Sequence, residues 1–197
     1  QIVHAKGSMK KETPENHKFT IVSALAQIER FSAQLASTTE LEEVYSFTTS
    51  LSREILRLDY STLLMLEDKG EKKLLLKATD GFPQDMVNNF ILRDGQGLPC
   101  LALESGKVET VIDFRFENRF EVTALMAELN IRSAIAAPMM IANKIFGVLI
   151  GHSLQQRKFS TEEQQVFQVL ANHAAIAIAN AKLIDSLYTS EQTRTKK

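Results

Sequence analysis

The chain has 197 residues, a formal net charge of −1 and a single cysteine, and 44% of its residues are hydrophobic. Charges of both signs are mixed along it, which disfavours nucleic-acid binding because phosphate recognition needs a concentrated positive field. One cysteine excludes an internal disulfide and suits a reducing compartment. No apolar run approaches the roughly 20 residues that span a bilayer, and no signal-peptide pattern is present. We therefore expect a cytoplasmic protein that contacts neither nucleic acid nor membrane.

The first residues carry no fold signal. Gln1 is not a methionine and Gly7-Ser8-Met9 has the form of a cloning junction, so we interpret residues 1–8 as a vector-derived tail. Residues 9–36 should hold a polar segment and then an amphipathic helix over residues 18–36, whose apolar side chains recur at helical spacing: Ile21, Leu25, Ile28 and Leu35.

A second helix and a hairpin follow. Thr39 and Glu42 have the spacing of a capping box, in which the hydroxyl accepts a hydrogen bond from a free helix N–H and the carboxylate reaches back. Residues 60–66 and 72–79 are apolar segments separated by the turn residues 67–71. This pattern predicts two antiparallel strands.

Glycines and prolines interrupt the middle of the chain, so short elements are expected there. These are a helix over 84–90, a strand over 90–93, a helix with Pro99 in its first turn that ends at Ser105, a strand over 107–112 and a helix over 117–129.

The last third predicts a second hairpin, with strands over 132–140 and 144–153, and then a long helix. Ser160 and Glu163 form a second capping box at the start of this helix. Because hairpins rather than βαβ crossovers connect the strands, we predict an α+β fold with a largely antiparallel sheet and helices on both faces.

The terminal helix is apolar on two sides. One stripe repeats every three or four residues like the a and d positions of a coiled coil: Val166, Leu170, His173, Ala177, Asn180, Ile184 and Leu187. The opposite side also carries apolar residues, such as Phe167 and Ile178. We expect one side to pack on the sheet and the other to form a homodimer interface, the alternative being a single helix that lies on its own sheet.

Catalytic and metal-binding patterns are weak. Cys100 lies near an expected helix start, where a thiol can be activated, but no histidine is near it in the sequence. We favour its interpretation as a small buried hydrophobe. The four histidines have no partners at metal-ligand spacing, so no metal site is expected.

Residues 113–120 combine three phenylalanines with two arginines. Phe114, Phe116 and Phe120 could wall a pocket, and Arg115, Arg119 or the later Arg132 could meet a carboxylate or phosphate. The alternative is that the phenylalanines belong to the core and the arginines are solvated.

Several motifs in the second half resemble the GAF domain family. They are the strand Ile131-Arg-Ser-Ala-Ile-Ala-Ala-Pro-Met139, the segment Asn143-Lys-Ile-Phe-Gly-Val-Leu149, Phe159-Ser-Thr-Glu-Glu163 and the helical run from Leu170 to Leu183, together with the turn Glu104-Ser-Gly-Lys107. The resemblance spans residues 37–187, which we take as the domain, and residues 188–197 would begin a truncated linker helix.

The resemblance implies an α/β/α sandwich around a five- or six-stranded antiparallel sheet, with the N- and C-terminal helices packed together on one face. It also implies a ligand pocket between the sheet and the middle segment. Candidate pocket residues by family position are Leu98, Cys100, Phe114, Phe120, Met126, Ser133 and Ile135, to which the chemistry of the arginines adds Arg115 and Arg132.

The sequence does not identify the ligand. A small metabolite or nucleotide fits the family, although only part of the cyclic-nucleotide pattern is present, since Gln164 follows Glu163 where that pattern has Asp-Glu. Leu101 rather than His follows Cys100, which disfavours a bilin, and haem is not expected either. One cysteine cannot carry the redox cycle of the sulfoxide-reducing members.

Two hypotheses follow from the resemblance and the terminal helix. The first is a non-enzymatic, small-molecule-sensing domain of a bacterial signalling protein, joined in the full chain to a kinase, cyclase, phosphodiesterase or transcription-activator output domain. The second is a ligand-free dimerisation module that relays strain between neighbouring domains. A thiol-dependent enzyme is a third interpretation, and it rests on Cys100 alone.

Overall fold

The structure is a computed structural model that describes residues 21–38, 40–69 and 71–194. The proposed vector tail and Thr39 of the first capping box lie outside these ranges. The helices are α1 (Ile21–Ser37), α2 (Leu41–Leu56), α3 (Gly97–Ser105), α4 (Ala124–Glu128) and α5 (Thr161–Arg194), with single 3-10 turns η1 (Gln84–Met86) and η2 (Phe114–Phe116). The strands are β1 (Tyr60–Lys69), β2 (Glu71–Asp80), β3 (Ile91–Arg93), β4 (Glu109–Val111), β5 (Ser133–Ile141) and β6 (Lys144–Ser153).

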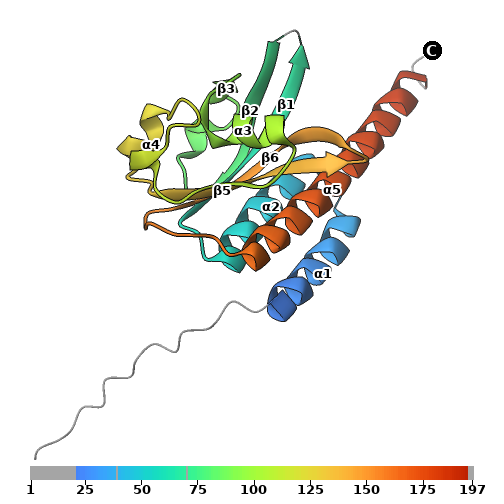
Figure 1. Cartoon of the computed structure of the whole chain (residues 1–197). Helices are drawn as coiled ribbons and strands as arrows, with labels where there is room; N and C mark the ends of the chain where they lie inside the picture. Colours follow the sequence, from blue (N-terminus) through green and yellow to red (C-terminus); the bar gives the residue numbers. More distant parts are fainter. Residues whose placement is uncertain (1–20, 39, 70, 195–197) are drawn as a thin grey trace, which may run out of the picture.

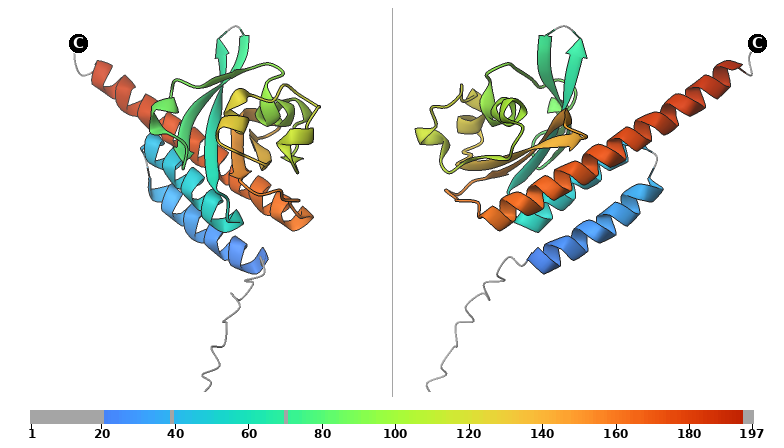
Figure 2. Two further views of the ribbon diagram at one scale, coloured as in Figure 1. Left: turned by 90° about the vertical axis from the view of Figure 1, so that its left-hand side faces the viewer. Right: turned by 45° about the vertical axis from the view of Figure 1, so that its right-hand side comes forward.

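The six strands form one sheet in the order β3-β2-β1-β6-β5-β4, with every neighbouring pair antiparallel. Helices α2 and α5 cover one face, and α3 and α4 lie over the other (Figure 1). Helix α1 packs outside α2 and α5, as a third layer on that side (Figure 2). This arrangement confirms the predicted α+β sandwich with the terminal helices together on one face.

Strand β6 lies near the centre of the sheet and serves two separate cores. Val148, Ile150 and His152 face the α3 and α4 side, whereas Leu149 faces α2 and α5. Side chains on a strand alternate between faces, so a register slip of one residue would exchange the two sets. The pairing of β6 with β1 and β5 therefore fixes what lies on each side.

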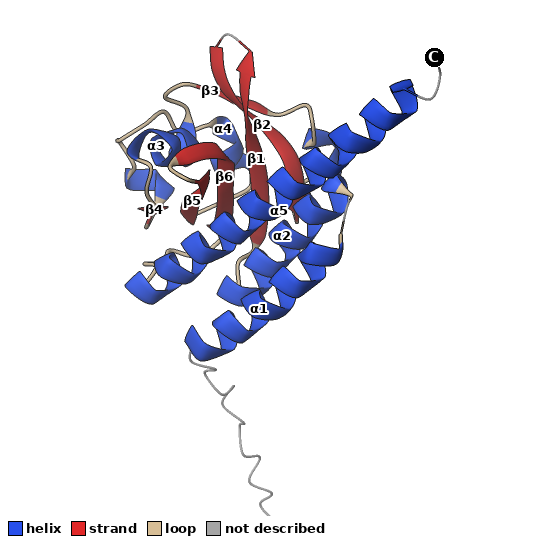
Figure 3. Cartoon of the chain, turned by 90° about the vertical axis from the view of Figure 1, so that its right-hand side faces the viewer, coloured by secondary structure: helices blue, strands red, loops and turns tan. Residues whose placement is uncertain are grey.

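Helix α5 is covered on two sides by its own chain. Phe167 and Ile178 belong to the core that the sheet and α2 complete, and Phe31 of α1 belongs to the same core. At the α1–α5 contact the Ser32 hydroxyl lies 2.7 Å from Nδ1 of His173, within hydrogen-bond distance. The three helices run side by side, α1 and α5 in the same direction, and α5 continues past the sheet (Figure 3).

The second capping box is confirmed. The backbone N–H of Glu163 donates to Oγ of Ser160 at 3.1 Å, and the N–H of Ser160 donates to Oε2 of Glu163 at 2.8 Å. The Glu163 carboxylate also pairs with Arg157, whose Nη1 donates to the carbonyl of Leu56 at 2.8 Å. One carboxylate thus joins the first turn of α5 to the end of α2.

The helix predicted over residues 117–129 is wrong for its first half, because helix α4 spans only Ala124–Glu128. The Glu117 carboxylate accepts hydrogen bonds from the backbone and side chain of Arg119, and the N–H of Gly97 donates to the carbonyl of Glu121 at 2.9 Å. The local bonds of Glu117 compete with helix formation, and the bond to Gly97 holds Glu121 to a distant segment instead of a helical turn. The helix predicted over 84–90 likewise shortens to the turn η1.

Gly147 and Gly151 of β6 allow close packing on the helix side of the strand. They differ in which neighbouring group would have to move if a Cβ were added. A Cβ at Gly147 would lie 2.3 Å from the backbone oxygen of Leu64, whereas one at Gly151 would meet a side-chain methyl of Leu58 at 2.3 Å. Backbone in a central ladder cannot move aside as a leucine side chain can.

We predict that Gly147→Ala lowers the free energy of unfolding by about 2–3 kcal/mol, as overpacking of a core does. Gly151→Ala should cost less because Leu58 can rotate. Urea denaturation with an unchanged m value would measure both. Equal stability of Gly147→Ala and the unsubstituted protein would contradict this packing.

Candidate functional site

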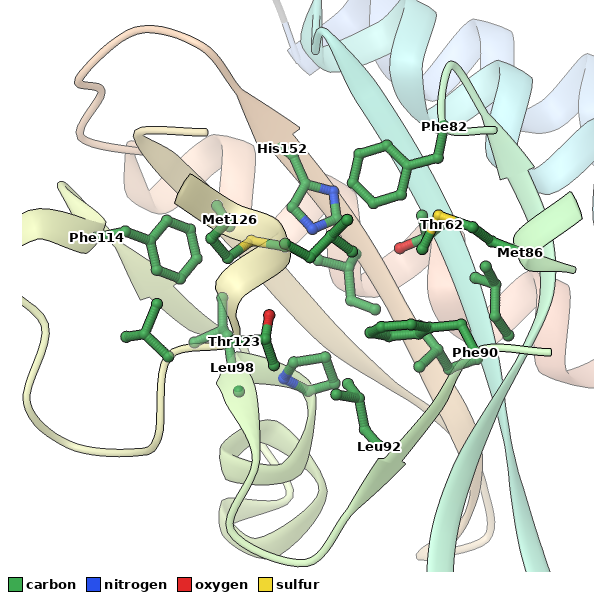
Figure 4. Close-up of a pocket in the computed structure, with 18 of the residues that line it drawn as sticks. Thr62, Phe82, Met86, Phe90, Leu92, Leu98, Phe114, Thr123, Met126 and His152 are labelled. Atoms are coloured by element: carbon green, nitrogen blue, oxygen red, sulfur yellow. The ribbon is translucent and has the colours of Figure 1, made fainter. Parts of the chain in front are cut away.

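A small apolar cavity of about 40 Å³ lies between the sheet and the segment that carries α3 and α4. Figure 4 shows side chains from both layers that converge on it. The sheet contributes residues of β1, β2, β3, β5 and β6, and the middle segment supplies phenylalanines and methionines. The wall includes Thr62, Leu64, Phe82, Met86, Phe90, Leu92, Leu98, Phe114, Phe120, Thr123, Met126, Ile150 and His152.

The polarity of the wall is low. Among the described residues that line the cavity, only Thr62, Thr123 and His152 have polar side chains, and none is an acid, a lysine or an arginine. Metabolite sites usually occupy about 300–1,000 Å³. A guest of that size would have to displace side chains, and Met86 and Met126 are suited to this because methionine is unbranched and adaptable.

His152 is the least usual member of the wall. Its side chain is buried, with 5% of its surface exposed, and Nδ1 has no hydrogen-bond partner among the described residues. The ring lies 5.0 Å from the ring of Phe82, centroid to centroid, and Phe82 packs in turn on Tyr60. Burial in these apolar surroundings lowers the pKa of His152 to about 3, so its imidazole is neutral at pH 7.

Of the residues predicted to bind a ligand, Leu98, Phe114, Phe120 and Met126 line the cavity. Phe114 and Phe120 contact each other edge to face, with centroids 6.5 Å apart. Of the three phenylalanines in residues 113–120, these two lie in the cavity wall. Phe116 instead points outward, with 78% of its surface exposed.

Arg115 and Arg132 line a neighbouring cavity of about 210 Å³, which shares Phe114 and Met126 with the first. Arg115 is engaged by Asp113, whose carboxylate accepts from its backbone and guanidinium groups. This pairing lowers the pKa of Asp113 to about 2. The two arginines therefore lie beside the apolar cavity and not in its wall.

Three predicted pocket residues are placed elsewhere. Ile135 faces the α2 and α5 core, because it alternates with Ala134 and Ala136 on β5. Ser133 shares the face of Ile135, and its hydroxyl donates to the carbonyl of Gln155 at 2.8 Å. Cys100 is buried next to the cavity without lining it.

The thiol of Cys100 donates to the carbonyl of Arg93, with a sulfur–oxygen distance of 3.1 Å. Burial raises its pKa to about 11, so the thiol stays protonated at neutral pH. Because a thiolate is the nucleophilic form, this environment supports the interpretation of Cys100 as a core residue. No three His, Cys, Asp or Glu side chains of the described ranges gather closely enough to hold a metal ion.

Sequence reasoning missed Thr62, Phe82, Phe90 and His152. The alternation along β6 held the signal for His152, since Val148 and Ile150 precede it at a spacing of two. Phe82 and Phe90 lie in irregular backbone around η1, where no periodic pattern points a side chain toward a pocket.

Comparison with known proteins identifies this architecture. The sequence profile of the GAF domain matches residues 40–178. The chain belongs to the GAF domain family. Within its described ranges, no helix of this GAF domain is both long and apolar enough to cross a membrane.

Solved structures agree with the profile. The GAF domain of a phosphoenolpyruvate-protein phosphotransferase from Coxiella burnetii superposes with a TM-score of 0.77 at 21% identity, over 85% of this chain and 99% of that one. A free methionine-R-sulfoxide reductase from Neisseria meningitidis, solved with its substrate, reaches 0.71 at 15% identity, over 93% and 98% of the two chains. At these identities the likeness concerns the fold.

A relative by sequence is the circadian input-output histidine kinase CikA of Synechococcus elongatus, 30% identical over 83 residues. The aligned part covers 42% of this chain and 11% of the kinase. GAF domains are thus signalling and sensory modules of kinases and phosphotransferases, and they occur in the same chains as output domains. The reductase shows that some proteins of this fold are enzymes.

The buried imidazole should make stability depend on pH. His152 has its ordinary pKa of 6.5 when unfolded and about 3 when folded. Below pH 6.5 the unfolded chain therefore binds a proton that the folded chain does not, and stability falls as the pH drops toward 3.

We predict that the protein loses about 2 kcal/mol more free energy of unfolding between pH 7 and pH 5 than a His152→Leu variant does. Urea titrations at the two pH values measure the free energy of unfolding of both proteins. Because the variant keeps all other titrating groups, the difference between the two losses is due to His152. Parallel losses in both proteins would show that His152 is not buried as a neutral ring.

Proposed function

We propose that this GAF domain is a regulatory, non-catalytic module that binds a small molecule in the apolar cavity and signals its occupancy through α5. The observation that carries the proposal is the position of the cavity. It lies on the sheet face opposite the terminal helices, and the same strands touch both.

Strand β6 connects the cavity with the helix layer. Ile150 and His152 border the cavity, while Leu149, the residue before Ile150, faces the opposite core. The neighbouring strand β5 packs on α5 on that same side. After β6, Arg157 binds the carbonyl of Leu56 at the end of α2 and the carboxylate of Glu163 in α5. A guest that shifts β6 would therefore move groups that hold the start of α5.

The end of α5 is the proposed output. The helix runs to Arg194 and passes beyond the sheet (Figure 1). In the full-length protein it would continue toward an output domain such as a kinase, cyclase, phosphodiesterase or transcription activator. We also propose that the protein is bacterial and cytoplasmic.

We also propose that the protein forms a dimer, through a surface that differs from the predicted stripe. Val166 and Leu170 of the predicted stripe are buried inside the protomer, and His173 is engaged by α1, so these residues serve the fold. Farther along, Asn180 is exposed, as are Ile176 and Leu183, which have 50% and 62% of their surface in contact with solvent.

Ile176, Asn180 and Leu183 have the four–three spacing of a heptad, and Leu187 continues it with 63% exposure. Ala177 and Ile184, from the original stripe, are partly buried beside these residues. We propose that a second copy of the chain covers this surface, helix against helix. The polar Asn180 would then fix the register of the pair.

A ligand-free relay is the competing function, and the small volume of the cavity favours it. In that case the apolar wall is simply a second core, and neighbouring domains set the position of α5. The absence of charged lining residues from the described part of the chain is compatible with both functions.

Thermal shift across a panel of metabolites and nucleotides separates the two. A ligand at about 100 times its Kd adds roughly 2.7 kcal/mol to the free energy of unfolding, and that corresponds to a rise in Tm of about 5–10 °C for a domain of this size. Ala134→Val, which narrows the cavity floor, should reduce the shift, whereas the surface control Val22→Ala should not. A flat panel would favour the ligand-free relay.

For the dimer, we predict that Leu183→Glu converts the protein to monomers in sedimentation velocity experiments, because a charge would be buried in the helix pair. Gln165→Glu, an exposed site in the first turns of the same helix, is the matched control. A dimer that survives Leu183→Glu unchanged, or an unsubstituted protein that sediments as a monomer at high concentration, rules out this interface.

A further inference from the structure

The cavity holds a polar atom that the fold does not use. Nδ1 of His152 lacks a hydrogen-bond partner among the described residues, although the side chain is 95% buried and faces the cavity in Figure 4. A buried polar atom without a partner destabilises the folded state, because it has given up its hydrogen bonds with water. Such an atom in the wall of a cavity is a candidate anchor for a guest.

The surroundings of this atom restrict what the guest can be. The nearby wall is apolar, with Phe82 on the histidine ring and Phe90 and Leu92 farther along. A charged group would lose its hydration there without a counter-ion, since no charged side chain of the described residues lines the cavity. Phenylalanine faces and edges instead favour an aromatic ring.

A hydroxyl is the group that suits the imidazole best. A neutral histidine carries its proton on one of the two ring nitrogens, so Nδ1 is either a donor or an acceptor. A hydroxyl can serve as the partner in both cases. Thr62 and Thr123 line the same cavity, and the hydroxyl of either could form the second hydrogen bond of the guest's hydroxyl group.

We propose that the cavity takes an uncharged aromatic molecule with a hydroxyl group, which pairs with Nδ1 of His152. This inference deepens the proposed sensory function and rests on it. The guest would enter by displacing Met86, Met126 and Phe90, which are partly buried side chains of the middle segment.

Three probes of similar size test the proposal: phenol, toluene, which lacks the hydroxyl, and benzoate, which is charged. Each is titrated into protein with ¹⁵N-labelled histidine and ¹³C-labelled methionine methyl groups, observed by NMR. Phenol should shift the Nδ1 resonance of His152 and bind about 2–10-fold more tightly than toluene, the range that one net hydrogen bond supplies.

In His152→Leu, phenol and toluene should bind equally. If this variant does not fold, the comparison of phenol with toluene in the unsubstituted protein decides alone. Equal binding there, with Nδ1 unmoved, overturns the anchor but leaves the sensory function intact. Tighter binding of benzoate overturns the uncharged class and points to Arg132 in the neighbouring cavity. If no probe shifts the methyl groups of Met86 or Met126, the inference fails, and the metabolite panel separately decides the proposed function.

Discussion

The register of β6 is the constraint on which the rest of the structure depends. It is paired on both edges, and its side chains face a tight helix-side core and a looser core on the opposite side. Gly147 and Gly151 let the backbone approach its neighbours on the helix side. On the other side, Ile150 and His152 leave room that the middle segment does not fill completely.

This division explains why one half of the molecule is regular and the other is not. The helix side is built from long periodic elements that bury continuous apolar stripes, so its packing is close. The cavity side is closed by short helices, 3-10 turns and loops. Local bonds such as Glu117–Arg119 and Asp113–Arg115 hold those loops in place of a helical ladder.

The contrast between periodic elements on the helix side and short elements and loops on the cavity side also determines how much of the structure the sequence could predict. Both hairpins, the terminal helix and its capping box at Ser160 follow from apolar periodicity and turn residues, which act over a few positions. The helix predicted over 117–129 was wrong because its bonds to residues 95–97 are not local. Among the residues suggested by family position, Leu98 and Met126 line the cavity, whereas Ile135 lies on the other face of the sheet. His152 was overlooked because the alternation along β6 groups it with Val148 and Ile150 but does not tell which face of the strand borders a cavity.

Helix α5 shows how a correct pattern can have more than one cause. Its second apolar side was expected to bind another chain, yet α1 covers the first half of that side within the protomer. Among the described residues, Asn180 and Leu187 of the predicted stripe are exposed, together with Ile176 and Leu183 beside them. Dimerisation and signal output are therefore proposed for the end of the helix that projects past the sheet, while its beginning belongs to the domain core.

The central claim is that the sheet separates a closely packed core from one that can accept a guest. A crystal structure under xenon pressure tests this directly, because xenon enters apolar cavities without specific chemistry. We predict a xenon site beside His152 and Phe82, on the α3 and α4 side of the sheet. Xenon bound only between the sheet and α5, or a cavity side that takes up none, would contradict it.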